Sequence, residues 1–262
     1  MPELPEVETR LLYFQRVALG KRVERAVVTA PNMIKSSSAR AFVKGMRGRR
    51  FVDASRRGKY LIVTLDPRGA LILHFGMGGD LYYYKSPGDR PDYTRMEFLL
   101  TNGWRLAFTC PRKICRVMLA NDASEIPALK EMGPEPLGNA FSLAFLQRLV
   151  EERPRRQIKP LLMDQKMIAG VGNIYADEIL FEAKVRPDRT ASALSEEEIK
   201  RIHKETRRVL RRSLRTAADE EFPADFLVSR SGRGALCKIC GQPIEKKTIG
   251  GRTAYLCPNC QV

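Results

Sequence analysis

The sequence predicts an α+β protein of two domains: an N-terminal β-sandwich with a leading helix, and a C-terminal helical domain that ends in a metal-binding β-hairpin. Short β-branched and aromatic runs fill the first half, helical patterns follow a proline- and glycine-rich segment, and two Cys-x-x-Cys pairs close the chain. We expect domains at 1–133, 140–228 and 229–262, with a linker at 134–139 and a short loop opening the last segment.

A helix over residues 7–18 is expected to precede seven strands. Turn formers separate these strands, and the pair Asn102-Gly103 is typical of a tight hairpin. Short strands at this spacing favour a β-sandwich or a flattened barrel. The predicted strands cover residues 22–30, 51–56, 60–65, 70–75, 80–84, 94–101 and 104–109.

The second half begins after two prolines, Pro134 and Pro136, which lie between glycines and predict a linker. Further on, Ser195 and Glu198 have the spacing of a capping box, so we expect a helix from there to about Leu214. Its many lysines and arginines are interpreted as a solvated face. We also expect a helix around residues 226–228.

Charge is the strongest signal in the composition. Lysine and arginine number 46 against 30 acidic residues, a formal net charge of +16. Such an excess attracts polyanions, and each neutralised phosphate releases a counterion. Nucleic acid is the favoured partner, although ribosomal proteins and proteins that bind anionic membranes share this composition. Because we find neither an apolar run of membrane-spanning length nor a secretory signal, we expect a cytoplasmic protein with no membrane partner.

Four of the six cysteines predict a structural zinc ion. Cys237 and Cys240 form one pair, Cys257 and Cys260 form another, and 16 residues separate the pairs. Two such pairs supply the four thiolates of a tetrahedral zinc site, which leaves no open position for catalysis. A redox dithiol is the rival interpretation. The residues between the pairs read as two strands and a turn.

The N-terminal segment from Pro2 to Thr9 resembles the start of the formamidopyrimidine-DNA glycosylase family. Further family motifs follow in order: Arg57-Gly58-Lys59-Tyr60-Leu61, His74-Phe75-Gly76-Met77-Gly78-Gly79, Met132-Gly133-Pro134-Glu135-Pro136-Leu137 and Gly170-Val171-Gly172-Asn173-Ile174-Tyr175-Ala176. With the four-cysteine terminus, the ordered set is highly specific. The resemblance implies a helix-two-turn-helix in the C-terminal domain and a base-excision repair enzyme acting on double-stranded DNA, expected to be monomeric.

The resemblance makes Pro2 the nucleophile once Met1 is removed. An N-terminal amine titrates near about pH 8, so a useful fraction is neutral and nucleophilic. By resemblance the chain is both a glycosylase and an abasic-site lyase. Glu3 matches the catalytic acid, Glu6 a second carboxylate near the amine, and Lys59 a lysine that contacts the phosphate beside the lesion. For Glu6, a favourable charge at a helix start is an almost equally good explanation.

Other positions that match the family pattern are expected to contact DNA. The family refills the space of a flipped-out base with a methionine, an arginine and a phenylalanine, which correspond here to Met77, Arg112 and Ile114. Ile114 therefore departs from the family pattern. Asn173 and Arg252 match residues that grip the phosphate backbone, and Asn173 is also expected to cap a helix. A dinucleotide site at Gly170-Val171-Gly172 would need a preceding strand, whereas residues 161–163 read as helix, so no redox or nucleotide cofactor is expected.

Further departures bear on specificity. Cys110 replaces an aspartate that is usual in the family, and the segment 229–236 is shorter than the loop that closes over 8-oxoguanine in typical members. We therefore expect formamidopyrimidines or oxidised pyrimidines to be better substrates than 8-oxoguanine. Cys110 and Cys115 are interpreted as small buried residues, and His74 and His203 as core or loop residues.

Two other functions remain open at this stage. A non-catalytic DNA-damage binder would keep the grip on DNA without the chemistry. A zinc-ribbon protein that binds RNA would explain the charge and the cysteines but not the N-terminal segment.

Overall fold

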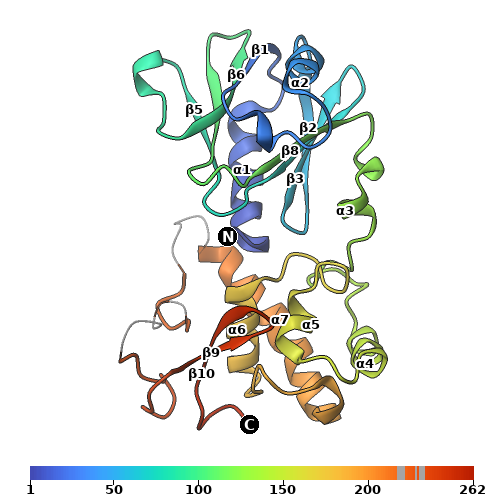
Figure 1. The fold of residues 1–262 in the computed structure, drawn as a ribbon, viewed down its shortest axis with the longest axis vertical. Coiled ribbons are helices and arrows are strands. Elements are labelled where there is room, and N and C mark those ends of the chain that lie inside the picture. The colour runs from blue at the N-terminus through green and yellow to red at the C-terminus, as the bar shows by residue number, and fades with distance from the viewer. Residues whose placement is uncertain (217–221, 228, 230–233) are drawn as a thin grey trace. The chain divides into compact units, whose positions relative to one another are not determined.

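The computed structural model describes residues 1–216, 222–227, 229 and 234–262 (Figure 1). These residues divide into two compact units. The N-terminal unit comprises Met1–Pro2 and Glu6–Glu131, and the C-terminal unit comprises Glu3–Pro5 and Met132–Val262. The first helix, α1 (Leu4–Ala18), therefore contributes its first two residues to the C-terminal unit and the others to the N-terminal unit.

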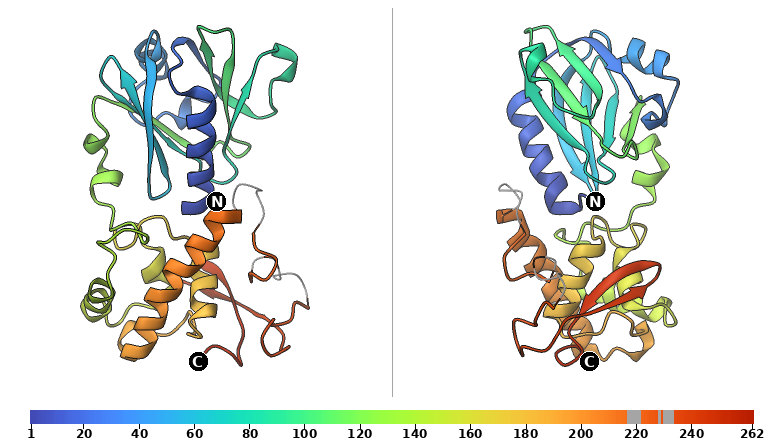
Figure 2. Two further views of the ribbon diagram at one scale, coloured as in Figure 1. Left: turned by 180° about the vertical axis from the view of Figure 1, so that it is seen from behind. Right: turned by 60° about the vertical axis from the view of Figure 1, so that its left-hand side comes forward.

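Two antiparallel four-stranded sheets form the N-terminal unit, with strand orders β1-β6-β7-β5 and β2-β3-β4-β8. Figure 2 shows them as two layers, with α1 running alongside. The strands are β1 (Val23–Val28), β2 (Arg50–Arg57), β3 (Tyr60–Asp66), β4 (Ala70–His74), β5 (Asp80–Tyr84), β6 (Thr94–Leu100), β7 (Arg105–Thr109) and β8 (Arg116–Ala120).

The two sheets share one hydrophobic core with α1. Phe51 of β2 lies 5.9 Å from Phe98 of β6, centroid to centroid, and 5.2 Å from Phe14 of α1. All three rings are fully buried. Edge-to-face contacts of this kind add to the stabilisation from burial. Because the core lies between two separate sheets, the predicted sandwich is confirmed and the flattened barrel is not.

Several elements differ from the sequence expectations. Helix α1 begins at Leu4 rather than residue 7, because Pro5 is tolerated in the first turn of a helix. Helix α2 (Ala39–Met46) and strand β8 were not predicted. The remaining short elements are η1 (Pro31–Met33), η2 (Pro87–Asp89), η3 (Ala123–Glu125) and α3 (Pro127–Lys130).

The C-terminal unit is helical and ends in a β-hairpin, as predicted. Its last residue, Val262, exchanges backbone hydrogen bonds with Lys184 and Arg186, at 3.3 and 3.1 Å. A hydrophobic core joins its helices, with Tyr175 and Leu180 among the fully buried residues. The elements are α4 (Leu143–Glu152), α5 (Ile158–Met163), α6 (Asn173–Glu182), η4 (Ala191–Ala193), α7 (Glu196–Thr216), β9 (Glu245–Ile249) and β10 (Arg252–Leu256).

The predicted capping box of α7 is present. The Ser195 N–H donates to Glu198 Oε2 at 2.8 Å, and the Glu198 N–H donates to Ser195 Oγ at 3.3 Å. The basic face is only partly solvated, because Arg207 donates to the carbonyl of Leu137 at 3.2 Å and Arg201 to that of Ala183 at 2.9 Å. Part of the positive charge on α7 therefore holds the unit together.

The prediction of a helix around residues 226–228 was wrong for residues 226 and 227, which the structure describes. Phe226 and Leu227 lie in turns, where the Phe226 N–H donates to the Pro223 carbonyl at 2.9 Å. Val228 and residues 230–233 lie outside the described part of the chain, and with them half of the short loop predicted at 229–236.

Candidate active site and DNA-binding residues

The N-terminal residues are built into the fold. Pro2 and Glu3 are buried, whereas Met1 is 50% exposed. The Leu4 N–H donates to the Gly170 carbonyl at 3.0 Å. Gly170 adopts a φ of +79°, and a side chain there would approach Leu4 to 2.8 Å, so only glycine allows this contact. The position of the residues that follow Pro2 is thus fixed by the C-terminal unit.

Glu3 caps the N-terminus of helix α6 by accepting hydrogen bonds from its backbone N–H groups. Its carboxylate accepts hydrogen bonds from the N–H groups of Gly172 at 2.6 Å, Ile174 at 3.0 Å and Tyr175 at 3.4 Å. These are the donors that a helix N-terminus leaves without intrahelical partners, and the helix dipole favours a negative charge there. No local pattern indicated this arrangement, because Glu3 and α6 are far apart along the chain.

Asn173 occupies the first position of α6, and Gly172 is the N-cap residue. The prediction that Asn173 caps the helix was therefore wrong, since Glu3 takes that role. Among the described residues, Asn173 Oδ1 is buried without a hydrogen-bond partner. The preceding loop is held by Gln165, which accepts from the Gly170 N–H at 2.9 Å and donates to the Val171 carbonyl at 2.7 Å. Sequence reasoning did not identify Gln165.

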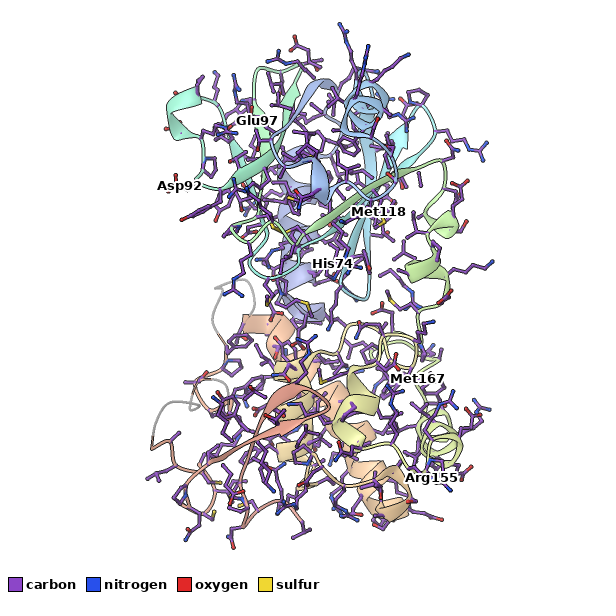
Figure 3. The ribbon with its side chains drawn as sticks, viewed as in Figure 1. His74, Asp92, Glu97, Met118, Arg155 and Met167 are labelled. Carbon is purple, nitrogen blue, oxygen red and sulfur yellow. A yellow bond between two sulfur atoms is a disulfide. The ribbon has the colours of Figure 1, made fainter. Side chains whose placement is uncertain are left out.

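Lys59 lies in the two-residue turn between β2 and β3 and is only 5% exposed. The adjacent Tyr60 pairs with His74 across β3 and β4, and the centroids of the two rings are 4.8 Å apart. Figure 3 labels His74 in the N-terminal unit. Burial, with the positive charges of Arg116 and Lys59, lowers the pKa of His74 to about 4. His74 is partly buried, and its Nδ1 accepts from the Gly76 N–H at 3.2 Å.

Glu6 lies in the first turn of α1 and is partly buried. Its backbone carbonyl accepts a hydrogen bond from Arg10 at 2.9 Å. A carboxylate in the first turn is favourable to the helix dipole. The described contacts of Glu6 are therefore consistent with its helix-start interpretation.

The structure brings Met77 and Arg112 together. Met77 lies between β4 and β5, on a turn whose Gly76 and Gly78 have φ values of 52° and 85°. Arg112 Nη1 approaches the Met77 sulfur to 3.4 Å. Met77 is 39% exposed and Ile114, on the same loop as Arg112, is 45% exposed. Three residues matched to one function by resemblance thus lie on two loops of the N-terminal unit, on which their side chains reach solvent.

Cys110 and Cys115 are bonded to each other. Both are buried, as predicted, but they form a disulfide rather than two separate core residues. Their Cα atoms lie 6.3 Å apart, within the usual range for a disulfide. The sequence could not distinguish the two arrangements, because a spacing of five residues brings two side chains together only in particular loop conformations.

The four C-terminal cysteines fit a zinc ion. Their sulfur atoms all lie within 4.8 Å of one another. The Cys237 and Cys260 sulfurs are 3.8 Å apart, and those of Cys240 and Cys257 are 3.5 Å apart. A tetrahedron with zinc–sulfur bonds of about 2.3 Å has sulfur–sulfur edges of about 3.8 Å. The ion is structural, because four thiolates complete its coordination.

A buried ion pair anchors the hairpin that carries Arg252. Lys159 of α5 is fully buried, lies 2.7 Å from the Asp177 carboxylate of α6, and donates to the Thr253 carbonyl of β10 at 2.7 Å. Asp177 also accepts from the Tyr255 N–H at 3.1 Å. Burial raises the pKa of Asp177 to about 6 against the attraction of Lys159. Arg252 itself begins β10 and is exposed. Sequence reasoning missed this pair, although a lysine within the apolar segment of α5 was a possible sign.

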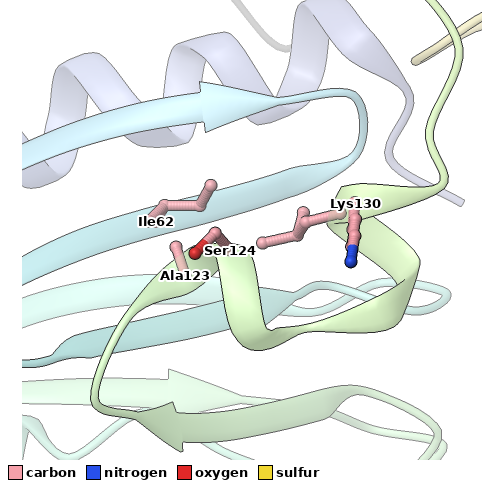
Figure 4. Close-up of a pocket in the computed structure, with 5 residues that line it drawn as sticks. Ile62, Ala123, Ser124 and Lys130 are labelled. Carbon is pink, nitrogen blue, oxygen red and sulfur yellow. The ribbon is translucent and has the colours of Figure 1, made fainter.

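A further hollow lies in the N-terminal unit. It is lined by Ile62, Ala123, Ser124, Leu129 and Lys130 (Figure 4), none of which was predicted to act in the site. Among the described residues, no helix is both long and apolar enough to cross a membrane.

Comparison with known proteins covers the whole chain. Residues 1–117 match the formamidopyrimidine-DNA glycosylase N-terminal domain, 132–221 the corresponding H2TH domain, and 234–262 a zinc finger found in FPG and IleRS. The formamidopyrimidine-DNA glycosylases of Pelotomaculum thermopropionicum and Listeria monocytogenes are each 36% identical to the chain. The matches span 100% of the chain and 99% and 100% of those proteins.

Solved structures of formamidopyrimidine-DNA glycosylases are similar to this chain over almost its whole length. The Lactococcus lactis formamidopyrimidine-DNA glycosylase, bound to DNA containing an abasic site, is similar with a TM-score of 0.89 and 28% identity over 99% of both chains. The MutM protein of Thermus thermophilus gives a TM-score of 0.84 at 34% identity, over 99% of this chain and 98% of that one.

These matches discriminate among the functions left open by the sequence. A zinc-ribbon protein that binds RNA would not account for residues 1–117, and a non-catalytic binder is not favoured by full-length relatives that are named as glycosylases. The chain belongs to the formamidopyrimidine-DNA glycosylase family, whose members are enzymes of base-excision DNA repair.

Proposed function

We propose that this chain excises oxidised bases from double-stranded DNA and then cleaves the abasic site, with the amine of Pro2 as nucleophile. The observation that carries the proposal is the placement of Glu3. The residue beside the proposed nucleophile is fixed by three backbone N–H donors, so the N-terminus is held rather than free. A fixed nucleophile reduces the entropic part of the activation barrier.

The chemistry begins after removal of Met1. The neutral Pro2 nitrogen attacks C1′ of the sugar, and the bond to the damaged base breaks. The Pro2 nitrogen then loses its proton, the C1′–O4′ bond of the sugar breaks and O4′ takes up a proton, which opens the ring. The product is an iminium, whose positive charge acidifies C2′. Loss of a C2′ proton expels the 3′ phosphate, and a second elimination expels the 5′ phosphate. We assign Glu3, with Glu6 as a further carboxylate, to proton transfer at the opened sugar.

DNA is held by two groups of residues in this proposal. Lys59, Asn173 and Arg252 contact phosphates of the DNA backbone, which positions the lesion without reading sequence. Asn173 lies at the first position of α6, where its side-chain NH2 group would donate to a phosphate oxygen. Met77, Arg112 and Ile114 fill the space that the flipped base leaves, and their exposure on two loops supports that role.

Formamidopyrimidines are the proposed substrates, with oxidised pyrimidines and 8-oxoguanine as further candidates. Structures related to this chain hold an oxidised pyrimidine in DNA, in the Lactococcus lactis enzyme, and carbocyclic 8-oxoguanine in DNA, in a MutM protein. We expect 8-oxoguanine to be the weakest of the three because of the short segment 229–236. The enzyme is proposed to act as a monomer in the cytoplasm, where bacterial DNA lies.

Borohydride trapping tests this function. Duplexes carrying an abasic site, a formamidopyrimidine, an oxidised pyrimidine or 8-oxoguanine are incubated with the Met1-free protein and reduced. Peptide mass mapping is expected to find the DNA adduct on Pro2, with yields falling in the order given for the lesions. A protein that retains Met1 is the matched control and should give no adduct. Tight binding without any adduct would instead indicate a non-catalytic damage binder, and a higher yield for 8-oxoguanine would contradict the lesion order.

A further inference from the structure

The disulfide between Cys110 and Cys115 closes the loop that carries two of the proposed void-filling residues. Only four residues lie inside it, Pro111, Arg112, Lys113 and Ile114. Lys113 has a φ of +55°, in the left-handed region that non-glycine residues rarely adopt. The loop makes a tight reversal within a very short segment, and its two ends are joined covalently.

Both ends of this loop are anchored in the N-terminal unit. The Cys110 N–H donates to the Tyr93 carbonyl at 3.0 Å, and the Cys110 carbonyl accepts from Arg95 Nε at 3.1 Å. Cys115 directly precedes β8 and is 1% exposed. Between these ends, the Lys113 N–H donates to the Cys110 carbonyl at 3.3 Å, the Cys115 N–H approaches the Cys110 sulfur to 3.3 Å, and Asn32 donates to the Lys113 carbonyl at 3.2 Å.

The closed loop also contacts the turn that carries Met77. A side chain on Gly76 would approach the Cys115 nitrogen and the Ile114 carbonyl to 2.9 Å each, and one on Gly79 would approach the Cys115 sulfur to 2.7 Å. The two loops are therefore in close backbone contact at the disulfide. Beyond it, Arg112 reaches the Met77 sulfur at 3.4 Å.

We propose that Cys110 and Cys115 are positioning residues, whose disulfide holds Arg112 against Met77 in the geometry that reads the base opposite the lesion. The inference rests on the proposed function, which assigns Arg112 to that base. An arginine on an exposed loop without a disulfide would lose conformational freedom on binding DNA. That entropic cost weakens its discrimination between opposite bases. The covalent closure removes most of that freedom before DNA arrives.

The bond itself is checked first on the full-length protein purified without reductant. Trypsin cuts after Arg105, Arg112, Lys113 and Arg116, so the bond should link peptide 106–112 to peptide 114–116. We expect this linked pair by mass spectrometry, converted to two free thiol peptides by a phosphine reductant. Finding only the free thiol peptides in the untreated protein would overturn the proposal.

The functional test compares the oxidised protein, the phosphine-reduced protein and the variant Cys110→Ser/Cys115→Ser. Single-turnover excision is measured for one lesion placed opposite C and opposite A. We expect the rate to fall about tenfold in the reduced protein and in the variant, and the ratio between the two opposite bases to shrink at least about threefold. The phosphine should not change the variant, which shows that it acts through this bond. Equal zinc content in all samples shows that the four finger cysteines are unaffected.

A single-stranded oligonucleotide with an abasic site separates this inference from the proposed function. It has no opposite base, so its cleavage requires the Pro2 chemistry but not the Arg112 reading. All three samples should cleave it within about twofold of one another. If the oxidised protein fails to cleave it, the proposed function is wrong. If it is cleaved equally while the ratio between opposite bases is the same in all three samples, the positioning role is wrong. Should the variant not fold, the oxidised and reduced proteins alone decide the result.

Discussion

At the scale of single residues, Glu3 combines two roles. Its carboxylate closes the start of α6 through three N–H donors, and it lies next to the proposed nucleophile. A substitution there therefore changes stability and chemistry together. The two effects are separable, because the first is seen in unfolding and the second in the rate of reaction.

We expect Glu3→Gln to lower the free energy of unfolding by about 1–2 kcal/mol, because a neutral amide is a weaker partner for the helix start. Excision should fall at least about hundredfold through loss of the acid. Urea unfolding and single-turnover rates measure the two effects. Glu196→Gln, which removes an exposed acid in the first turn of α7, is the control and should change stability by less than about 0.5 kcal/mol. A variant with wild-type stability would show that Glu3 does not cap α6.

His74 gives a pH-dependent prediction. Its pKa is lowered to about 4, so between that pH and its ordinary value of 6.5 the unfolded chain binds a proton that the folded protein does not. The contribution of His74 to the free energy of unfolding is therefore fully present above pH 6.5. As the pH drops to 4, the free energy of unfolding falls by about 3 kcal/mol through this group.

Nuclear magnetic resonance can follow this titration directly, because the chain has only two histidines. We expect the His74 ring to remain neutral down to about pH 4, with the signals assigned by His203→Gln. A midpoint near 6.5 for His74 would contradict the lowering of its pKa by burial and by the charges of Arg116 and Lys59.

At the scale of elements, Lys159 and Asp177 connect α5 and α6 to the hairpin β9–β10. Lys159→Met leaves Asp177 buried without its partner, which should lower the free energy of unfolding by about 3–5 kcal/mol. Adding Asp177→Asn should recover at least half of that loss, because an amide oxygen can still accept from the Tyr255 N–H. Urea unfolding followed by circular dichroism tests both variants. A loss of equal size in the double variant would mean that packing, not the unpaired charge, dominates.

The sequence predicted elements well where one pattern dominates. The seven predicted strands, the capping box of α7 and the cysteine hairpin depend on local periodicity or spacing, and the structure contains them all. Helix α2 and strand β8 were missed because they are short, and Gly45 lies inside α2.

The site was less predictable because its contacts are distant in sequence. The hydrogen bonds of Glu3 to α6 and of Lys159 to β10 each join segments that no local pattern relates. The family motifs identified Glu3 as a candidate site residue, but only the structure shows its hydrogen-bond partners at the start of α6. Cys110 and Cys115 lie close in sequence, and their bond depends on a loop conformation that composition does not determine.

At the scale of the whole molecule, the two units have separate hydrophobic cores, one centred on the sheets and one on the helices. The single tryptophan, Trp104, belongs to the N-terminal unit and stacks on Tyr83 with a centroid distance of 4.6 Å. Its fluorescence therefore reports on that unit alone, whereas the zinc cysteines belong to the other.

We expect a zinc chelator to lower the urea midpoint of the helical circular dichroism signal while the midpoint of Trp104 fluorescence stays the same. The fluorescence of untreated protein in the same urea series is the reference. The variant Cys257→Ser should show the same lowered midpoint when no chelator is added. If both signals shifted together, the two units would unfold as one and the separation of their cores would not govern stability.

The ends of the chain set a practical limit on how this protein can be labelled. An affinity tag or dye attached ahead of Pro2 would block the amine that we propose as the nucleophile, and the backbone of Val262 is hydrogen-bonded to Lys184 and Arg186. The turn η2 (Pro87–Asp89) is exposed and belongs to neither the proposed chemistry nor the zinc site. A fluorophore introduced there would allow single-molecule tracking of the search for damage along DNA, with both termini left in their native state.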